Sequence, residues 1–209
     1  MFFSFDIHFH TCLSVKMNES DLCPTLWRTC RALAGKTRLK ILGDLIKHPA
    51  QTVSGVAIRN NISVPLASIS LRVLNARGLI ASHRDGRLVF YSVLPNRRIP
   101  WIAQLVASAC RVFSGRRKPV DLLYRQATAF THPRRITICH VLFCKGRLNY
   151  QDLVLQCQVS PAALNRHLVK LQKRGFVSCS ASLWSVATPK DDFSKALLKI
   201  LVEQGLAII

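Results

Sequence analysis

The chain repeats itself at a fixed offset of 97 residues, and this repeat constrains the fold more than any other feature of the sequence. The clearest matches are Leu26-Trp27-Arg28 with Leu123-Tyr124-Arg125, Leu71-Arg72-Val73-Leu74 with Leu168-Val169-Lys170-Leu171, and Arg77-Gly78-Leu79-Ile80 with Arg174-Gly175-Phe176-Val177. The alignment needs no gap between Cys23 and Ile80. A fixed period that spans several helices is typical of a duplicated domain. We therefore predict two domains of about 90 residues each.

The repeat divides the 209 residues into four parts. They are an N-terminal extension at 1–22, a first domain at 23–113, a basic linker at 114–119 and a second domain at 120–209. The extension is apolar and aromatic but lacks a basic start and a small-residue cleavage site, so we expect a flexible arm and not a signal peptide. Whether residues 1–16 belong to the native protein stays open. No apolar run reaches the roughly 18 residues that cross a bilayer.

The first copy reads as four helices, a hairpin and a fifth helix. Apolar residues at helical spacing predict the helices at 24–33, 36–47, 52–59, 63–77 and 99–113. Ser63 is a suitable N-cap and Gly78 a suitable end for the fourth helix. Two short strands, 79–84 and 87–93, flank Asp85-Gly86, which is a strong signal for a two-residue hairpin loop. This order of elements predicts a winged helix-turn-helix domain.

The second copy repeats this order up to Gly175 and then diverges. Pro133 takes the first position of its second helix, and Ser160 is the N-cap of its fourth helix. Residues 178–186 contain no Lys or Arg, so we expect a short, uncharged second hairpin. The predicted fold class is mainly α with small β-hairpins (α+β), in two tandem winged helix-turn-helix domains.

The charge of the chain points to an anionic partner. Thirty Lys and Arg against ten Asp and Glu give a net charge of +20, spread along both copies. Double-stranded DNA is the partner we predict, and an anionic membrane surface is the weaker alternative. The sequence offers no glycine-rich phosphate loop, nucleophile elbow or paired carboxylates, so we do not expect an enzyme.

Eight residues are predicted to contact DNA: Ser68, Arg72, Arg84, Arg87, Asn165, Arg166, His167 and Lys170. Arg84 and Arg87 flank the tip of the first hairpin, where a ribbon reaches phosphates or a minor groove. The fourth helix of the second copy offers side chains that pair with base edges. At the groove-facing positions the first copy has Ser68, Ile69, Ser70 and Arg72. Either both fourth helices form one composite DNA surface, which we favour, or the second copy is mainly a dimerisation partner.

Three segments of the first copy, residues 33–42, 63–74 and 78–92, resemble the ArsR family of bacterial winged-helix repressors. The resemblance covers about residues 23–113, and the hairpin is its most specific part. It implies a transcriptional regulator, usually a homodimeric repressor, that binds an operator in a bacterial cytoplasm and is associated with the nucleoid. The alternative is a tandem winged-helix adaptor in chromosome organisation or replication initiation.

The ligands of the family's metal sensors are missing from this chain. These sensors carry a cysteine pair where this sequence has Val53 to Ile58, and zinc sensors carry carboxylates and histidines where it has Trp101 to Phe113. We therefore expect no metal site and no cofactor, and the effector stays unknown. The remaining sets, His140 with Cys144 and His8 with His10 and Cys12, are too small for a zinc site.

The helix at 99–113 is apolar nearly all round and must be buried. Its counterpart at 193–206 is also apolar on one side. In the resembling family the first and last helices build the dimer interface, so we expect the two copies to pack across these helices as an intramolecular pseudo-dimer. The apolar end at 206–209 leaves a homodimer through the terminal helices open.

Eight cysteines without framework spacing predict free thiols in a reducing cytoplasm. Cys139 matches Leu42 of the other copy and Cys30 matches Ala127, so most cysteines are expected to be small buried hydrophobic residues. A thiol redox switch at Cys23 or Cys30 is an alternative that requires exposure.

Overall fold

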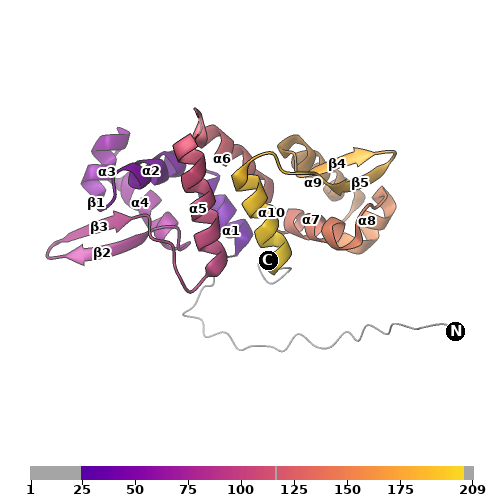
Figure 1. The fold of residues 1–209 in the computed structure, drawn as a ribbon, viewed down its shortest axis with the longest axis horizontal. Coiled ribbons are helices and arrows are strands. Elements are labelled where there is room, and N and C mark those ends of the chain that lie inside the picture. Colours follow the sequence, from indigo (N-terminus) through magenta and orange to yellow (C-terminus); the bar gives the residue numbers. More distant parts are fainter. Residues whose placement is uncertain (1–24, 116, 205–209) are drawn as a thin grey trace.

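The computed structural model describes residues 25–115 and 117–204 of the chain (Figure 1). The first half contains α1 (Leu26–Leu33), α2 (Lys36–Lys47), β1 (Gln51–Thr52), α3 (Val53–Asn60), α4 (Val64–Asn75), β2 (Ala81–Asp85), β3 (Leu88–Ser92) and α5 (Pro100–Gly115). The second half contains α6 (Pro119–Ala127), the 3-10 turn η1 (Thr128–Phe130), α7 (Pro133–Lys145), α8 (Tyr150–Cys157), α9 (Pro161–Arg174), β4 (Val177–Ser180), β5 (Leu183–Val186) and α10 (Asp192–Gln204). The predicted class, mainly helical with small antiparallel hairpins, is confirmed.

Both halves run through the same order of elements: four helices, a hairpin and a last helix. The last helix of the first half continues to Gly115 and α6 begins at Pro119, so helix covers both ends of the predicted linker. The predictions for residues 1–22, and for the apolar end at 206–209, lie outside the described residues. None of the described helices is long and apolar enough to span a membrane.

The repeat extends to individual hydrogen bonds. The Arg38 side chain donates from Nε to the carbonyl oxygen of Ala32, and Arg135 donates in the same way to Ala129, its match in the second half. The fourth helices also begin alike, because the Ser63 hydroxyl accepts from the Leu66 amide and the Ser160 hydroxyl accepts from the Ala163 amide. These caps are the predicted ones, and each satisfies an amide that the helix itself leaves without a partner.

The turns repeat as well. Between the third and fourth helices, Asn61 and its match Gln158 both adopt the left-handed conformation, with φ of 51° and 50°. After the fourth helices, Gly78 and Gly175 have φ of 67° and 83°, a region that glycine enters without steric cost. The same two turns therefore aim the fourth helix of each half and lead into its hairpin.

Each half has a small antiparallel sheet. In the first half β3 lies between β1 and β2; in the second, β4 pairs with β5, and Leu148 forms a bridge to Trp184 where the first half has β1. The short strand β1 and the bridge were not predicted. The loop of the first hairpin was predicted one residue too early. It consists of Gly86 and Arg87, because glycine takes the first loop position with φ of 56°.

The two halves contact each other through their first and last helices. The last helices α5 and α10 lie side by side at the centre of the molecule, and α6 packs against α1 and α2 (Figure 1). Leu105 of α5 and Leu197 of α10 are fully buried in a core that is continuous through both halves. The contacts between last helices agree with the packing that their apolar sequences predict.

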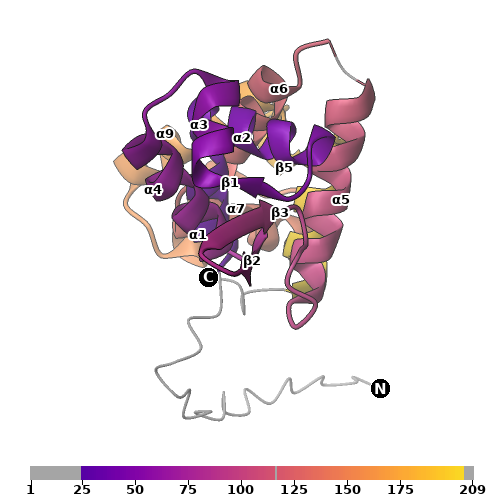
Figure 2. The same ribbon diagram turned by 90° about the vertical axis from the view of Figure 1, so that its left-hand side faces the viewer.

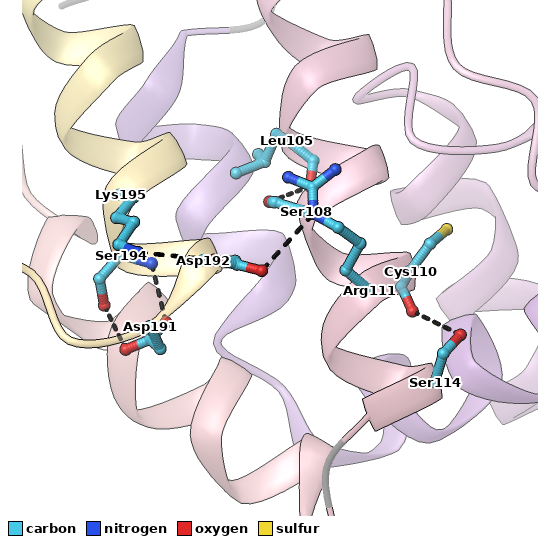
Figure 3. A network of polar contacts seen from close by, with 9 residues as sticks. All are labelled: Leu105, Ser108, Cys110, Arg111, Ser114, Asp191, Asp192, Ser194 and Lys195. Atoms are coloured by element: carbon cyan, nitrogen blue, oxygen red, sulfur yellow. Dashed lines mark hydrogen bonds and ion pairs between the residues drawn. The ribbon is translucent and has the colours of Figure 1, made fainter.

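Polar contacts mark the ends of the central helices (Figure 3). The buried Asp191 carboxylate accepts from the Ser194 amide at 2.9 Å and from the Ser194 hydroxyl at 2.7 Å, which caps the start of α10. It also accepts from Gln126 of α6 at 3.0 Å. On the surface, Arg111 Nε of α5 lies 3.6 Å from Asp192 Oδ2. These contacts set the position of α10 relative to α5 and α6.

Candidate nucleic-acid interface

The fourth helices of the two halves, α4 and α9, lie on the same side of the molecule. In Figure 2 both appear on the left and α5 on the right, and in Figure 1 both are among the more distant, fainter elements. The two hairpins lie at opposite ends of the long axis (Figure 1). A straight, rigid partner such as a duplex can therefore meet both helices from one side.

The predicted residues of α4 are only partly accessible. Arg72 is exposed and Ser68 is half-buried. Ser70 was predicted to face a groove, and this prediction is wrong, because its side chain is 3% exposed. It lies beside Ala67 and Leu71 on the face of α4 that packs into the core. The outer face of α4 instead carries Ile69, which is 53% exposed, together with Arg72.

The first hairpin carries both predicted arginines in exposed positions. Arg84 lies on β2 opposite Val89, and Arg87 is in the loop. The second hairpin is shorter, with strands of four residues against five, as expected. Its loop residues Ala181 and Ser182 both have positive φ. Only the first hairpin presents positive charge at its tip.

The predicted residues of α9 divide between two flanks of the helix. Leu164, Leu168 and Leu171 are buried and define its inner face. Arg166 is exposed near the middle of the outer face, and Asn165 lies about 140° round the helix axis from Lys170. The structure thus brings Arg166, His167 and Lys170 together and leaves Asn165 on the other flank.

Arg166, His167 and Lys170 line a hollow of about 720 Å³ between α9 and the start of α7. The other residues that line this hollow, called the basic hollow below, are Thr131, His132, Arg134, Arg135, Gln158, Val159, Ser160 and Ala163. The arginines of α7 and His132 were not among the predicted site residues. The one available signal was the match of Arg135 with Arg38, which indicates a structural role and not a binding role.

Two histidines meet in the basic hollow. The rings of His132 and His167 lie with their centroids 4.8 Å apart. Burial, followed by the charges of His132 and the nearby arginines, lowers the pKa of His167 to about 4. Burial and the charges of Arg135 and Arg134 also lower the pKa of His132. Both rings are therefore neutral at pH 7, and the positive charge of the hollow comes from arginine and lysine.

The residues of the first half that match the lining of the basic hollow carry less charge. The matches of His132, Arg134, Arg166 and Lys170 are Gly35, Thr37, Ile69 and Val73. The exposed apolar side chains on α3 and α4 include Ile58, Val64, Leu66 and Ile69. The two halves thus share a backbone framework but present different surfaces on the side that carries α4 and α9.

Cysteine and histidine are arranged for packing more than for metal binding. Cys30 and Cys139 are buried, as predicted, and so is Cys157. Cys110 is half-buried and Cys144 and Cys179 are exposed, so the prediction that most cysteines are buried does not hold among the described residues. Burial raises the pKa of each of the three buried thiols, to about 11 for Cys157. A redox switch at Cys30 is therefore contradicted. Exposed Cys144 lies with Sγ 3.6 Å from Nε2 of His140. Among the described residues, no three potential ligands form a metal-binding group.

Part of the chain is similar to a known protein. No family model matches the chain. A stretch of 63 residues, 30% of this chain, is 38% identical to the transcriptional repressor SdpR of Bacillus subtilis (strain 168). The match covers 69% of that repressor.

Proposed function

This chain belongs to the same family as the transcriptional repressor SdpR, and from this premise we propose that it is a sequence-specific DNA-binding regulator of transcription. More narrowly, we propose a repressor of ArsR type in tandem form, with winged helix-turn-helix domains at 23–113 and 120–209. It acts in a bacterial cytoplasm, on the nucleoid. The proposal includes no enzymatic role.

One observation carries the proposal: the two serine-capped helices α4 and α9 lie on one side of a chain with a net charge of +20 (Figure 2). Arg72 and Arg166 are exposed on these helices. Arginine pairs with guanine through two hydrogen bonds in a major groove, and its charge also attracts phosphates. The two halves together then act as one composite reading surface, as the two subunits of a dimeric regulator do.

The packing of α5 on α10 supports an intramolecular pseudo-dimer. A dimeric regulator needs two copies to place two reading helices at a fixed distance. This chain carries both copies in one polypeptide, so one chain suffices to fix that distance. A homodimer of the whole chain through its terminal helices would be a further level of assembly, which the proposed DNA binding does not require.

Binding of random duplex DNA over a series of salt concentrations tests the proposal. We expect binding at low salt, with a log-log slope of about −0.9 for each phosphate that the protein neutralises. A double variant with Arg72 and Arg166 replaced by alanine should bind more weakly. A control in which Lys195 and Lys199 of α10 are replaced by alanine loses the same charge away from α4 and α9, and should bind almost normally. No binding at low salt, or equal losses in both variants, contradicts the proposal.

A second candidate function is favoured by the exposed apolar residues of α3 and α4. A tandem winged-helix adaptor would use such a surface to contact another protein. The variant Ile69→Ser separates the two functions. Contact with a thymine methyl group predicts a loss of DNA affinity of a few fold, whereas a protein contact predicts an unchanged affinity for DNA.

A further inference from the structure

The basic hollow concentrates positive charge without a compensating acid. Arg134 and Arg135 enter it from α7, and Arg166 and Lys170 enter it from α9. None of the described side chains that line it carries a carboxylate. Four cations around one concave space repel one another, and none of the ion pairs among the described residues includes any of them.

One of the four cations, Arg135, is held in place by hydrogen bonds that also serve the fold. The Arg135 guanidinium donates to the Ala129 carbonyl oxygen and, at 2.6 Å, to the Thr131 hydroxyl, so its position is fixed. Burial and the neighbouring cations Arg174, Arg135 and Lys173 lower the pKa of Lys170, which reflects the same crowding. A bound anion would reduce this repulsion.

We propose that the basic hollow is a binding site for a phosphate group. Guanidinium groups match a tetrahedral oxyanion through paired hydrogen bonds, and lysine adds a point charge. The first half shows that the shared framework does not require these charges, because its matching residues are uncharged apart from Arg38. Arg134, Arg166 and Lys170 are therefore charged in the second half only, and the hollow that they line is large enough for a small phosphorylated molecule.

Phosphate binding in the hollow is coupled to a proton on His167. The His132 ring accepts a hydrogen bond at Nδ1 from the Arg134 amide at 3.1 Å, and this bond favours neutral His132. His167 faces His132, Arg134, Arg135 and Arg166, all of which disfavour its charged form. A dianion among these groups offsets that repulsion, so His167 takes up a proton as the anion binds. Anion affinity consequently rises as the pH falls.

Sulfate is the probe for this site, because it is tetrahedral and stays a dianion over the range in which histidine titrates. Calorimetry on the full chain without DNA should show sulfate binding that tightens by about tenfold between about pH 7 and about pH 5. Histidine NMR signals should report a higher pKa for His167 in saturating sulfate. Absence of sulfate binding, or binding that is independent of pH, overturns the proposal.

Two variants locate the site. Exchange of Arg166 for isoleucine and Lys170 for valine installs the residues of the first half, and should weaken sulfate binding at least about tenfold. Replacement of Lys195 and Lys199 of α10 by alanine is the matched control, since it also removes two positive charges and neither residue lines the hollow. Equal losses in both variants contradict the site. Circular dichroism checks that each variant is folded.

A DNA arm separates the two sources of the phosphate group. If the hollow takes a free phosphate or a phosphomonoester, inorganic phosphate binds in the absence of DNA and releases DNA from the complex. If it takes a backbone phosphate, the single variant Lys170→Val loses affinity for all DNA sequences alike. The sulfate titration tests the anion site in the absence of DNA. A negative result there is therefore distinguishable from a failure of the proposed DNA-binding function.

Discussion

Replacement of Arg84 and Arg87 by alanine should weaken binding to every DNA sequence by a similar factor. Both side chains are exposed, Arg84 on β2 and Arg87 in the loop of the first hairpin. This hairpin lies at one end of the long axis (Figure 1). If each neutralises one phosphate, the log-log salt slope falls by about 0.9 per residue, or about 1.8 for the pair. By the same relation, each phosphate contact raises the DNA-binding constant about 8-fold at about 0.1 M salt relative to 1 M. Loss of both contacts should therefore lower the binding constant about 60-fold at about 0.1 M salt.

Fluorescence anisotropy with labelled duplexes of unrelated sequence measures this effect. The titrations are repeated at several salt concentrations, and circular dichroism verifies that the hairpin variant is folded. The matched control replaces Lys195 and Lys199, which lie on α10 and remove the same two charges. Its loss of affinity should be small, because α10 lies beside α5 in the nearer part of the view, whereas α4 and α9 are among the more distant elements (Figure 1).

Three results would refute the reasoning. An unchanged affinity and slope would mean that the first hairpin does not touch DNA. A loss of affinity with an unchanged slope would mean that the arginines contact something other than phosphate. An equal loss in the control would assign the effect to total charge and not to the hairpin.

Two further predictions concern stability. Arg38→Ala and Arg135→Ala should each lower the free energy of unfolding by about 1.5 to 3 kcal/mol. The reason is that each guanidinium donates a hydrogen bond to a carbonyl oxygen at the end of the preceding helical segment. Urea unfolding curves that match wild type would contradict this role. His167 has a pKa of about 4 in the folded chain against about 6.5 when unfolded, so the unfolded state binds more protons between these two values. The free energy of unfolding should therefore decrease as the pH is lowered from about 6.5 to about 4. Replacement of His167 by glutamine should flatten this dependence, and an unchanged pH profile would show that His167 does not cause it.

Local signals in the sequence predicted the helices and most of their ends, although α4 ends at Asn75 and not at the predicted Gly78. Ser63 and Ser160 cap the fourth helices as their side-chain chemistry predicts, and Gly78 and Gly175 supply the left-handed turns that follow. These features depend on residues within one turn of the helix, so neighbouring sequence is sufficient to find them. The repeat then carried each assignment from one half to the other.

The basic hollow was missed because no local pattern describes it. His132 and Arg134 lie far from Arg166 in the sequence and meet it only through the packing of α7 and η1 against α9. Ser70 was misplaced for a related reason. A polar residue on a helix reads as surface, but on α4 the inner face extends to include it. Burial of a small hydroxyl is set by tertiary contacts that the sequence of one helix does not reveal.

Selection of a preferred site from random duplex DNA, followed by comparison of Arg166→Ala on that site, tests the central claim most directly. The account predicts that one site is enriched by the unmodified chain. On that site the variant should lose about 1 to 3 kcal/mol of binding free energy and relax its preference at one or two base pairs, with a smaller loss on random DNA. Failure to enrich any site, or a variant that keeps full affinity and the same site, would contradict sequence-specific reading by α9.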